Sequence, residues 1–270
     1  MRRLFLSLLV LFLPATVQSA GLPVIVVLGD SLSAGYGIDH TLGWVSLLQK
    51  RLSDEGYPHQ VINASISGDT TRGGAARISA VLERNNPSLV VVELGGNDGL
   101  RGIGLGEMEK NLTQIVISIK ESQAIPLLVG VRLPPNYGVT YTEQFQSVFK
   151  SVADQSGASL VPKLMEGVAS DLDLMQTDGI HPLAEVQSRL LNNVWSVLGP
   201  LLFLLYINDI SESSKVLKFF LFDKIYLLTL TKMSSGASLK NLNRAGQSHT
   251  SRFVVSSLYH VPTFSLPSVT

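Results

Sequence analysis

The sequence predicts an α/β protein with a parallel β-sheet covered by helices on both faces. From about residue 22 onward, short apolar runs alternate with segments of helical periodicity, and polar or glycine-rich motifs follow the first three runs. Unbroken apolar runs are typical of strands that are buried on both faces. Repeated alternation of strands and helices favours one parallel sheet. The ligand site is then expected at the carboxyl ends of the strands.

Five apolar runs account for the predicted strands, and helices are predicted between and after them. The first strand is PVIVVL at 23–28, and the others are at 60–64, 88–94, 125–131 and 158–161. The predicted helices are at 44–52, 75–84, 108–122, 141–155 and 182–195, the last with Pro182 in its first turn. After about residue 200 this pattern ends, and 203–270 is predicted to be a largely irregular tail.

Composition excludes several kinds of site. The chain of 270 residues contains no cysteine, so disulfides, thiolate zinc sites and a cysteine nucleophile are ruled out. Its net charge is zero, but residues 1–202 carry 14 basic and 18 acidic side chains, and the remainder carries 7 and 3. This asymmetry is too small for a nucleic-acid partner, which would require a dense basic patch.

The N-terminus has the pattern of a secretory signal peptide. Arg2 and Arg3 precede a short apolar run, Pro14 ends the run, and small residues follow it. We expect residues 1–19 to be removed, with cleavage after Ser19 or Ala20. The alternative is a buried N-terminal strand or helix. The expected location is the periplasm or the exterior.

A serine nucleophile is expected at Ser31, in the segment GDSLS that directly follows the first strand. Serine needs a base, which is most often a histidine oriented by a carboxylate. Among the five histidines, His181 stands in the loop DGIHP, three residues after Asp178. His181 is therefore the predicted base and Asp178 its orienting carboxylate.

The oxyanion that forms during acyl transfer needs hydrogen-bond donors. The candidates are the backbone N–H of Ser31, the backbone N–H of Gly68 in SISGD, and the side-chain amide of Asn97 in GGND. Each of these motifs alone is more often an ordinary turn. Their order, each at the end of a predicted strand, favours one shared site.

These four blocks resemble the SGNH (GDSL) hydrolase superfamily, with Ser31, Gly68, Asn97 and His181 at its named positions. The strings GDSLSAGYGI, NASISGDTT, VELGGNDGLRG, RLPPNYG and DGIHP are similar to the bacterial thioesterase I, arylesterase and lysophospholipase L1 type. The resemblance covers about 22–202, and the hydrolase domain is expected at 20–202.

The resemblance implies a flavodoxin-like three-layer fold with five strands, a periplasmic location, and no cofactor or metal. It also implies hydrolysis of small esters, acyl thioesters and lysophospholipids, and in some members Asp178 has only a supporting role. We further expect a monomer without a stable membrane span. The glycine-rich segment Gly99–Gly106 is either a mobile loop or an ordinary connection. Arg101 is expected to be a solvated surface charge, and the alternative is a contact with an anionic headgroup.

The segment 196–210 has a different resemblance. It is similar to a palm-region segment of reverse transcriptases from non-LTR retroelements, and 213–222 continues the similarity. The paired aspartates of that family are missing, because Lys224 follows Asp223. We therefore expect a fused reading frame with its junction near 196–202, or else a natural C-terminal extension. The alternative to an active esterase is a non-enzymatic product whose apolar tail adheres to membranes or partners.

Overall fold

The structure is a computed structural model that describes residues 22–213 of the chain. Its centre is a five-stranded, fully parallel sheet with the strand order β2-β1-β3-β4-β5. The order is the doubly wound, flavodoxin-like arrangement, which reverses direction between β1 and β3. This confirms the predicted fold class. The strands are β1 (Val24–Gly29), β2 (Gln60–Asn63), β3 (Leu89–Glu93), β4 (Ile125–Val129) and β5 (Ser159–Val161).

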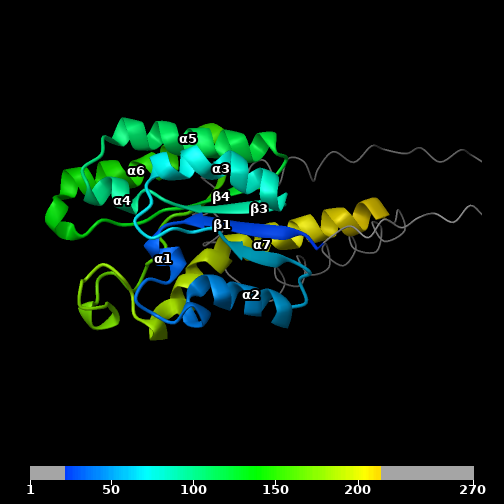
Figure 1. The fold of residues 1–270 in the computed structure, drawn as a ribbon, viewed down its shortest axis with the longest axis horizontal. Helices are drawn as coiled ribbons and strands as arrows, with labels where there is room; N and C mark the ends of the chain where they lie inside the picture. Colours follow the sequence, from blue (N-terminus) through cyan, green and yellow to red (C-terminus); the bar gives the residue numbers. More distant parts are fainter. Residues whose placement is uncertain (1–21, 214–270) are drawn as a thin grey trace, which may run out of the picture. The chain divides into compact units, whose positions relative to one another are not determined.

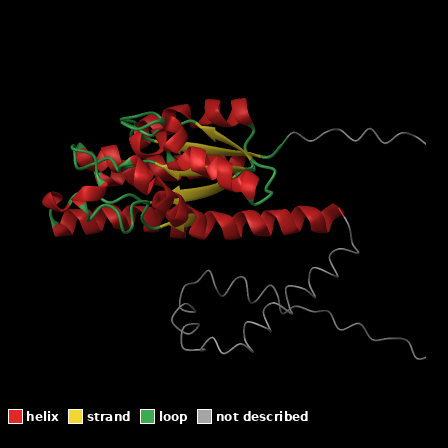
Figure 2. Ribbon diagram, turned by 90° about the horizontal axis from the view of Figure 1, so that it is seen from below, coloured by secondary structure: helices red, strands yellow, loops and turns green. Residues whose placement is uncertain are grey.

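Helices cover both faces of the sheet (Figures 1 and 2). In Figure 1, α3, α5 and α6 lie above the strands and α2 lies below them with the first part of α7. Shorter helices connect these layers. The helices are α1 (Ser31–Ala34), α2 (Trp44–Asp54), α3 (Thr71–Asn85), α4 (Gly96–Leu100), α5 (Leu105–Glu121), α6 (Val139–Ser156) and α7 (Gln187–Ser213), with single 3₁₀ turns at His40–Leu42, Pro135–Tyr137, Leu172–Leu174 and Ala184–Val186.

The core lies along the central strands. All residues of β3 are buried, as are all of β1 except its first, because helices pack on both sides of them. Strands β2 and β5 are partly exposed, as expected at the edges of the sheet. The buried residues of α5 recur at helical spacing. The rigid centre of the molecule therefore carries the ends of β1 and β3.

The predicted helix at 182–195 is wrong at both ends. Pro182 forms an isolated antiparallel bridge with Met175, and the Leu183 N–H donates to the Leu174 carbonyl, so this stretch is extended. The helix α7 begins only at Gln187 and continues through Pro200 to Ser213. Residues 203–213 are thus helical and not irregular. The remainder of the predicted tail, 214–270, lies outside the described residues, as does the predicted signal peptide.

Within the described residues, one helical stretch, Ala184–Leu205, is long and apolar enough to cross a membrane by length and composition alone. Its buried residues recur every three or four positions, as in a helix that packs one face against a core. The buried side chains are those of Val186, Gln187, Leu190, Leu191, Val194, Leu198 and Leu202. The chain divides into two compact units after Leu202.

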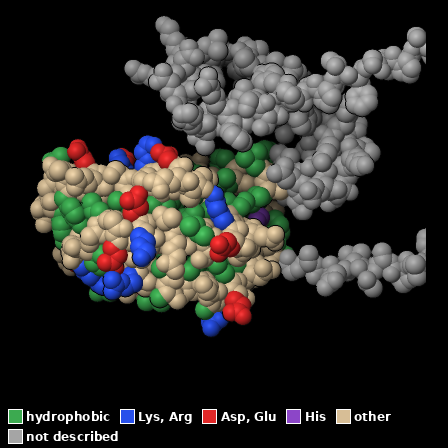
Figure 3. Space-filling view, turned by 90° about the horizontal axis from the view of Figure 1, so that it is seen from above, with side chains coloured by type: hydrophobic (Ala, Val, Ile, Leu, Met, Phe, Trp, Pro, Cys, Tyr) green, Lys and Arg blue, Asp and Glu red, His purple; other side chains and the backbone are tan. Residues whose placement is uncertain are grey.

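Charges are mixed on the face that α3, α5 and α6 cover. In Figure 3, basic and acidic side chains lie among apolar and neutral ones there. Ion pairs account for part of this mixing, including Arg72 with Glu107 and Lys150 with Asp154. The drawn part of this face therefore has charges of both signs side by side.

Candidate active site

Ser31, His181 and Asp178 form one continuous chain of hydrogen bonds. The distance from Ser31 Oγ to His181 Nε2 is 2.7 Å, and the distance from His181 Nδ1 to Asp178 Oδ2 is 2.6 Å. Ser31 is the first residue of α1, directly after the carboxyl end of β1. The structure thus brings together the three residues that the sequence selects, although 150 positions separate Ser31 from His181.

Local hydrogen bonds shape the loop that carries His181. Asp178 Oδ1 accepts the backbone N–H groups of Ile180 and His181, which folds the loop back on its own carboxylate. Partial desolvation raises the pKa of Asp178, but hydrogen bonds from His181 and Ile180 outweigh it and lower the pKa to about 2. Asp178 therefore stays ionised beside the imidazole and holds Nδ1 as the donor.

Gln176 links this loop to the loop that carries Ser31. Its Nε2 donates to the carbonyl of Tyr36 at 2.8 Å and to that of Pro182 at 3.2 Å, while its backbone N–H donates to the carbonyl of His181. The side chain needs Gly37 beside it, because a Cβ at that glycine would lie 2.1 Å from Gln176 Oε1. Gln176 therefore ties the two halves of the site together.

Tyr36 adds a second contact between these loops. Its ring centroid lies 4.5 Å from that of His181, with the planes tilted by 37°. The Tyr36 N–H donates to the carbonyl of Ser31, so the ring is fixed to the turn that holds the hydroxyl. A packed aromatic neighbour restricts the rotamers of the imidazole.

The predicted oxyanion donors lie at the ends of three neighbouring strands. Asn97 stands in α4, directly after β3, and Gly68 lies between β2 and α3 with a positive φ of 80°. Among the described residues, no hydrogen bond occupies the backbone N–H of Ser31 or of Gly68. Both N–H groups thus lack a protein acceptor in the described part of the chain, and their role as oxyanion donors stays a prediction.

Arg101 is not merely a solvated charge. Its Nη2 donates to the Gly68 carbonyl at 2.8 Å and approaches Asn97 Oδ1 at 3.4 Å. The Asn97 amide therefore has its oxygen toward Arg101 and its nitrogen toward Asp30, whose Oδ2 accepts from Nδ2 at 3.1 Å. One guanidinium connects two of the predicted oxyanion donors. The glycine-rich segment Gly99–Gly106 consists of the end of α4, a connection at 101–104 and the start of α5.

A buried pair of carboxyl groups lies beneath the site. Glu93 ends β3, is fully buried, and accepts from Ser33 Oγ at 2.7 Å and from the Asp30 N–H at 3.4 Å. Burial, and then the nearby Asp30 carboxylate, raises the pKa of Glu93 well above its usual range. Burial also raises the pKa of Asp30 to about 6. The neutral form of Glu93 avoids placing two negative charges side by side.

The two oxygens of the Asp30 side chain also hold the turn between β1 and α1 in place. Oδ1 caps α1 by accepting the Leu32 N–H at 3.0 Å, and Oδ2 holds Asn97. No role is predicted from the sequence for Asp30, Glu93, Gln176 or Tyr36. Asp30 and Tyr36 stand inside the string GDSLSAGYGI, and Glu93 is a charge inside an apolar strand, so these three positions have a signal in the sequence. Gln176 has none.

A largely apolar pocket opens beside Ser31. Its volume is about 570 Å³, within the range of small-ligand sites, and Ser31, Asn97 and His181 line it. Most of the other lining side chains are apolar and come from α1, the loop after β4, and the segments before His181. They include Leu32, Leu100, Val131, Leu133, Pro134, Met165, Leu172, Met175 and Ile180. The other histidines described lie elsewhere, since His40 bonds the Ala34 carbonyl and His59 is buried beside Tyr57.

Residues 27–189 match the model of the GDSL-like lipase/acylhydrolase family. The chain belongs to this family. Its relatives include the esterase TesA of Pseudomonas aeruginosa, 50% identical over 202 residues, which are 75% of this chain and all of that protein. The thioesterase 1/protease 1/lysophospholipase L1 of Escherichia coli is 41% identical over 69% of this chain and 88% of its own length.

Solved structures of this GDSL hydrolase family agree with the fold. A crystal structure of TesA has a TM-score of 0.65 at 52% identity, covering 66% of this chain and 99% of that one. The SGNH-hydrolase family esterase AlinE4 has a TM-score of 0.56 at 40% identity, covering 64% and 93%. An arylesterase of Vibrio mimicus is also 41% identical, over 66% of this chain and 90% of its own length. The chain is therefore an ester-hydrolysing enzyme.

Proposed function

We propose that this GDSL hydrolase cleaves carboxylic esters and thioesters through an acyl-enzyme on Ser31, with His181 as base and Asp178 as its orienting partner. The observation that carries the proposal is the unbroken series Ser31 Oγ, His181 Nε2, His181 Nδ1, Asp178 Oδ2 at the wall of an apolar pocket. A nucleophile in contact with an oriented base is the arrangement that acyl transfer needs.

In the acylation step, Ser31 Oγ attacks the carbonyl carbon while His181 Nε2 takes the hydroxyl proton. The negative charge moves to the carbonyl oxygen, where the N–H groups of Ser31 and Gly68 and the amide of Asn97 donate to it. The bond to the leaving oxygen or sulfur then breaks, and His181 returns the proton to that atom. The alcohol or thiol leaves, and the acyl group stays on Ser31.

In the deacylation step, water takes the place of the leaving group. His181 removes one proton from the water as its oxygen attacks the acyl carbon. The second tetrahedral intermediate uses the same three donors. Its collapse breaks the bond to Ser31 Oγ, which regains its proton from His181, and the carboxylic acid is released. Asp178 stays ionised throughout and stabilises the imidazolium.

The pocket favours substrates with an aliphatic acyl chain. Its apolar lining gains from burying methylene groups, at about 0.8 kcal/mol for each buried CH₂. Simple esters, acyl thioesters and lysophospholipids share such a chain and differ in the leaving group. The relatives named thioesterase, lysophospholipase and arylesterase support the same three substrate classes. We therefore propose that the enzyme accepts all three classes of substrate. We also propose that it needs no cofactor and acts as a monomer.

Covalent labelling tests this proposal. A fluorophosphonate should modify the enzyme once, and mass spectrometry of the digested protein should place the adduct on Ser31. Labelling should be much slower in His181→Ala, because the hydroxyl then lacks its base. The control is Ser46→Ala, which removes another hydroxyl and should not change the labelling. An adduct on a different residue would contradict the proposed nucleophile.

The proposal extends to the organisation of the chain. Residues 1–19 direct export to the periplasm or the exterior, 20–202 form the hydrolase domain, and the tail adds nothing to the chemistry. Leu202 is fully buried, whereas Phe203 and Leu204 after it are exposed. A chain that ends at Leu202 should therefore keep the kcat/KM of the full chain toward p-nitrophenyl esters. A large loss of activity in a folded truncated chain would show that the tail takes part.

A further inference from the structure

A second cavity lies next to the acyl pocket. It has a volume of about 400 Å³. It shares Arg132 and Leu133 with the acyl pocket, which is the apolar pocket beside Ser31, so those two residues lie between the cavities. Arg132 follows β4 and Lys163 follows β5, while the remaining wall is formed by α6. This cavity is therefore at the same edge of the sheet as Ser31.

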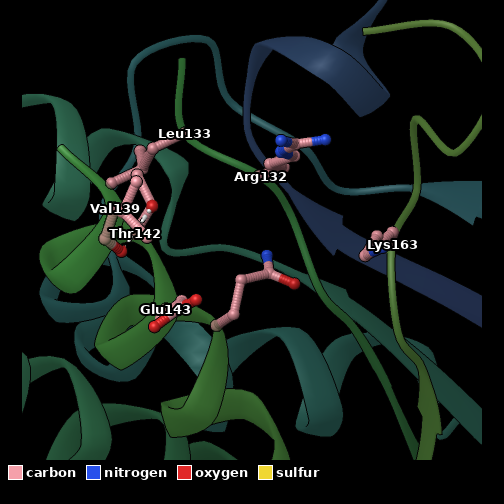
Figure 4. A pocket seen from close by; sticks show the side chains of 7 residues that line it. Arg132, Leu133, Val139, Thr142, Glu143 and Lys163 are labelled. Atoms are coloured by element: carbon pink, nitrogen blue, oxygen red, sulfur yellow. Dashed lines mark hydrogen bonds between the residues drawn. The ribbon is translucent and has the colours of Figure 1, made fainter. Parts of the chain in front are cut away.

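The charges of this second cavity are divided between its walls. Figure 4 shows Arg132 and Lys163 on one side and Glu143 on the other. Neither Arg132 nor Glu143 belongs to an ion pair among the described residues, and Lys163 pairs only with Glu166, at 3.0 Å. Two cations and a facing carboxylate are thus available to a ligand that carries both signs of charge.

We propose that this second cavity binds the zwitterionic phosphate–amine headgroup of a lysophospholipid, with the phosphate at Arg132 and Lys163 and the ammonium group at Glu143. The inference rests on the proposed function, since it requires the ester bond to be at Ser31. Guanidinium and ammonium groups are good partners for phosphate, and a carboxylate is a good partner for an alkylammonium group. The headgroup of such a lipid presents these two charges a short linker apart.

The carboxylate of Glu143 distinguishes between two leaving groups that carry phosphate, coenzyme A and a zwitterionic lipid headgroup. Coenzyme A carries several negative charges, and Glu143 would repel any of them that entered the cavity. A phosphocholine or phosphoethanolamine headgroup instead places a cation beside Glu143. The distribution of charge therefore favours the lipid over the acyl-CoA thioester as the ligand of this cavity.

Three substrates with the same short acyl chain separate the contribution of the phosphate to binding from that of the ammonium group. A monoacylglycerol has neither charge, a lysophosphatidylglycerol has only the phosphate, and a lysophosphatidylcholine has both. All are used as monomers, below their micelle concentration. Each variant is judged by the ratio of KM for a charged substrate to KM for the monoacylglycerol. These ratios cancel changes that act on the ester site itself.

In Lys163→Gln, both ratios should rise about two- to five-fold, the range for partly exposed ion pairs. In Glu143→Gln, only the lysophosphatidylcholine ratio should rise. Arg84→Gln removes an exposed charge at the far end of α3 and should change neither ratio. Arg132 is not used for this test because it also lines the acyl pocket.

Unchanged ratios in both Lys163→Gln and Glu143→Gln would overturn the proposal. A Lys163→Gln effect confined to acyl-CoA, together with faster acyl-CoA hydrolysis in Glu143→Gln, would also overturn it and assign the cavity to a polyanion. A wild-type enzyme that hydrolyses p-nitrophenyl esters but none of the three lipids would overturn it as well. A wild-type enzyme that hydrolyses neither, or a Ser31→Ala variant that keeps its activity, would instead refute the proposed function. The two failures are therefore distinguishable.

Discussion

Ser31→Ala should lower kcat/KM toward p-nitrophenyl esters by on the order of 10⁴- to 10⁶-fold, and His181→Ala should do nearly the same. The reason is the 2.7 Å contact between Ser31 Oγ and His181 Nε2, through which the proton must pass before the acyl bond can form. Neither residue can work without the other. The double variant should therefore be no slower than the slower single variant, which steady-state kinetics on purified proteins would measure.

Two controls make this result specific. Both variants should keep the far-UV circular dichroism and the melting temperature of the wild type, because neither side chain supports the core. His40→Ala, which removes an imidazole that contacts the Ala34 carbonyl and lies away from Ser31, should retain most activity. Activity in Ser31→Ala equal to that of the wild type would mean that another group attacks the carbonyl.

Asn97→Ala should lower kcat by about 10²- to 10³-fold and change KM little. The Asn97 amide is held by Asp30 at Oδ2 and approached by Arg101, so it is oriented before substrate arrives. Its donor acts fully only when the carbonyl oxygen becomes negative, which explains the effect on kcat.

Affinity for a phosphonate that mimics the tetrahedral intermediate should fall in parallel with kcat. The control is Asn85→Ala, since Asn85 bonds only its own helix at the Val81 carbonyl and should leave kcat unchanged. A loss below ten-fold in Asn97→Ala would show that the backbone donors of Ser31 and Gly68 are sufficient without the amide.

The strands and the three reacting groups could be predicted from the sequence because each follows a local rule. The strand at 88–94 is an apolar run, and the pairing of Asp178 with His181 needs only a turn of three residues. Parallel topology then places Ser31 and Asn97 at one edge of the sheet. Geometry that depends only on short segments and on the topology of the sheet can therefore be predicted from the sequence.

Features that depend on distant contacts were not accessible. Gln176 bonds the carbonyl of Tyr36, 140 positions away, and nothing in the local sequence indicates that the two residues are partners. The partnership of Asp30 with Glu93 requires knowledge that β1 and β3 are neighbours, and the register places Gly29 opposite Glu93. The last helix begins later than predicted because Pro182, which is a typical residue for a helix start, instead pairs with Met175 in a bridge. The signal peptide and most of the predicted tail stay predictions.

The link through Gln176 has a consequence for how this enzyme responds to heat. The segment that carries His181 lies outside the sheet, and a few hydrogen bonds and one ring contact hold it against the loop of Ser31. Segments held in this way open at a lower free energy than the core does. Catalysis should therefore fail on warming while the sheet is still intact, because opening of this segment separates His181 from Ser31 before the core unfolds.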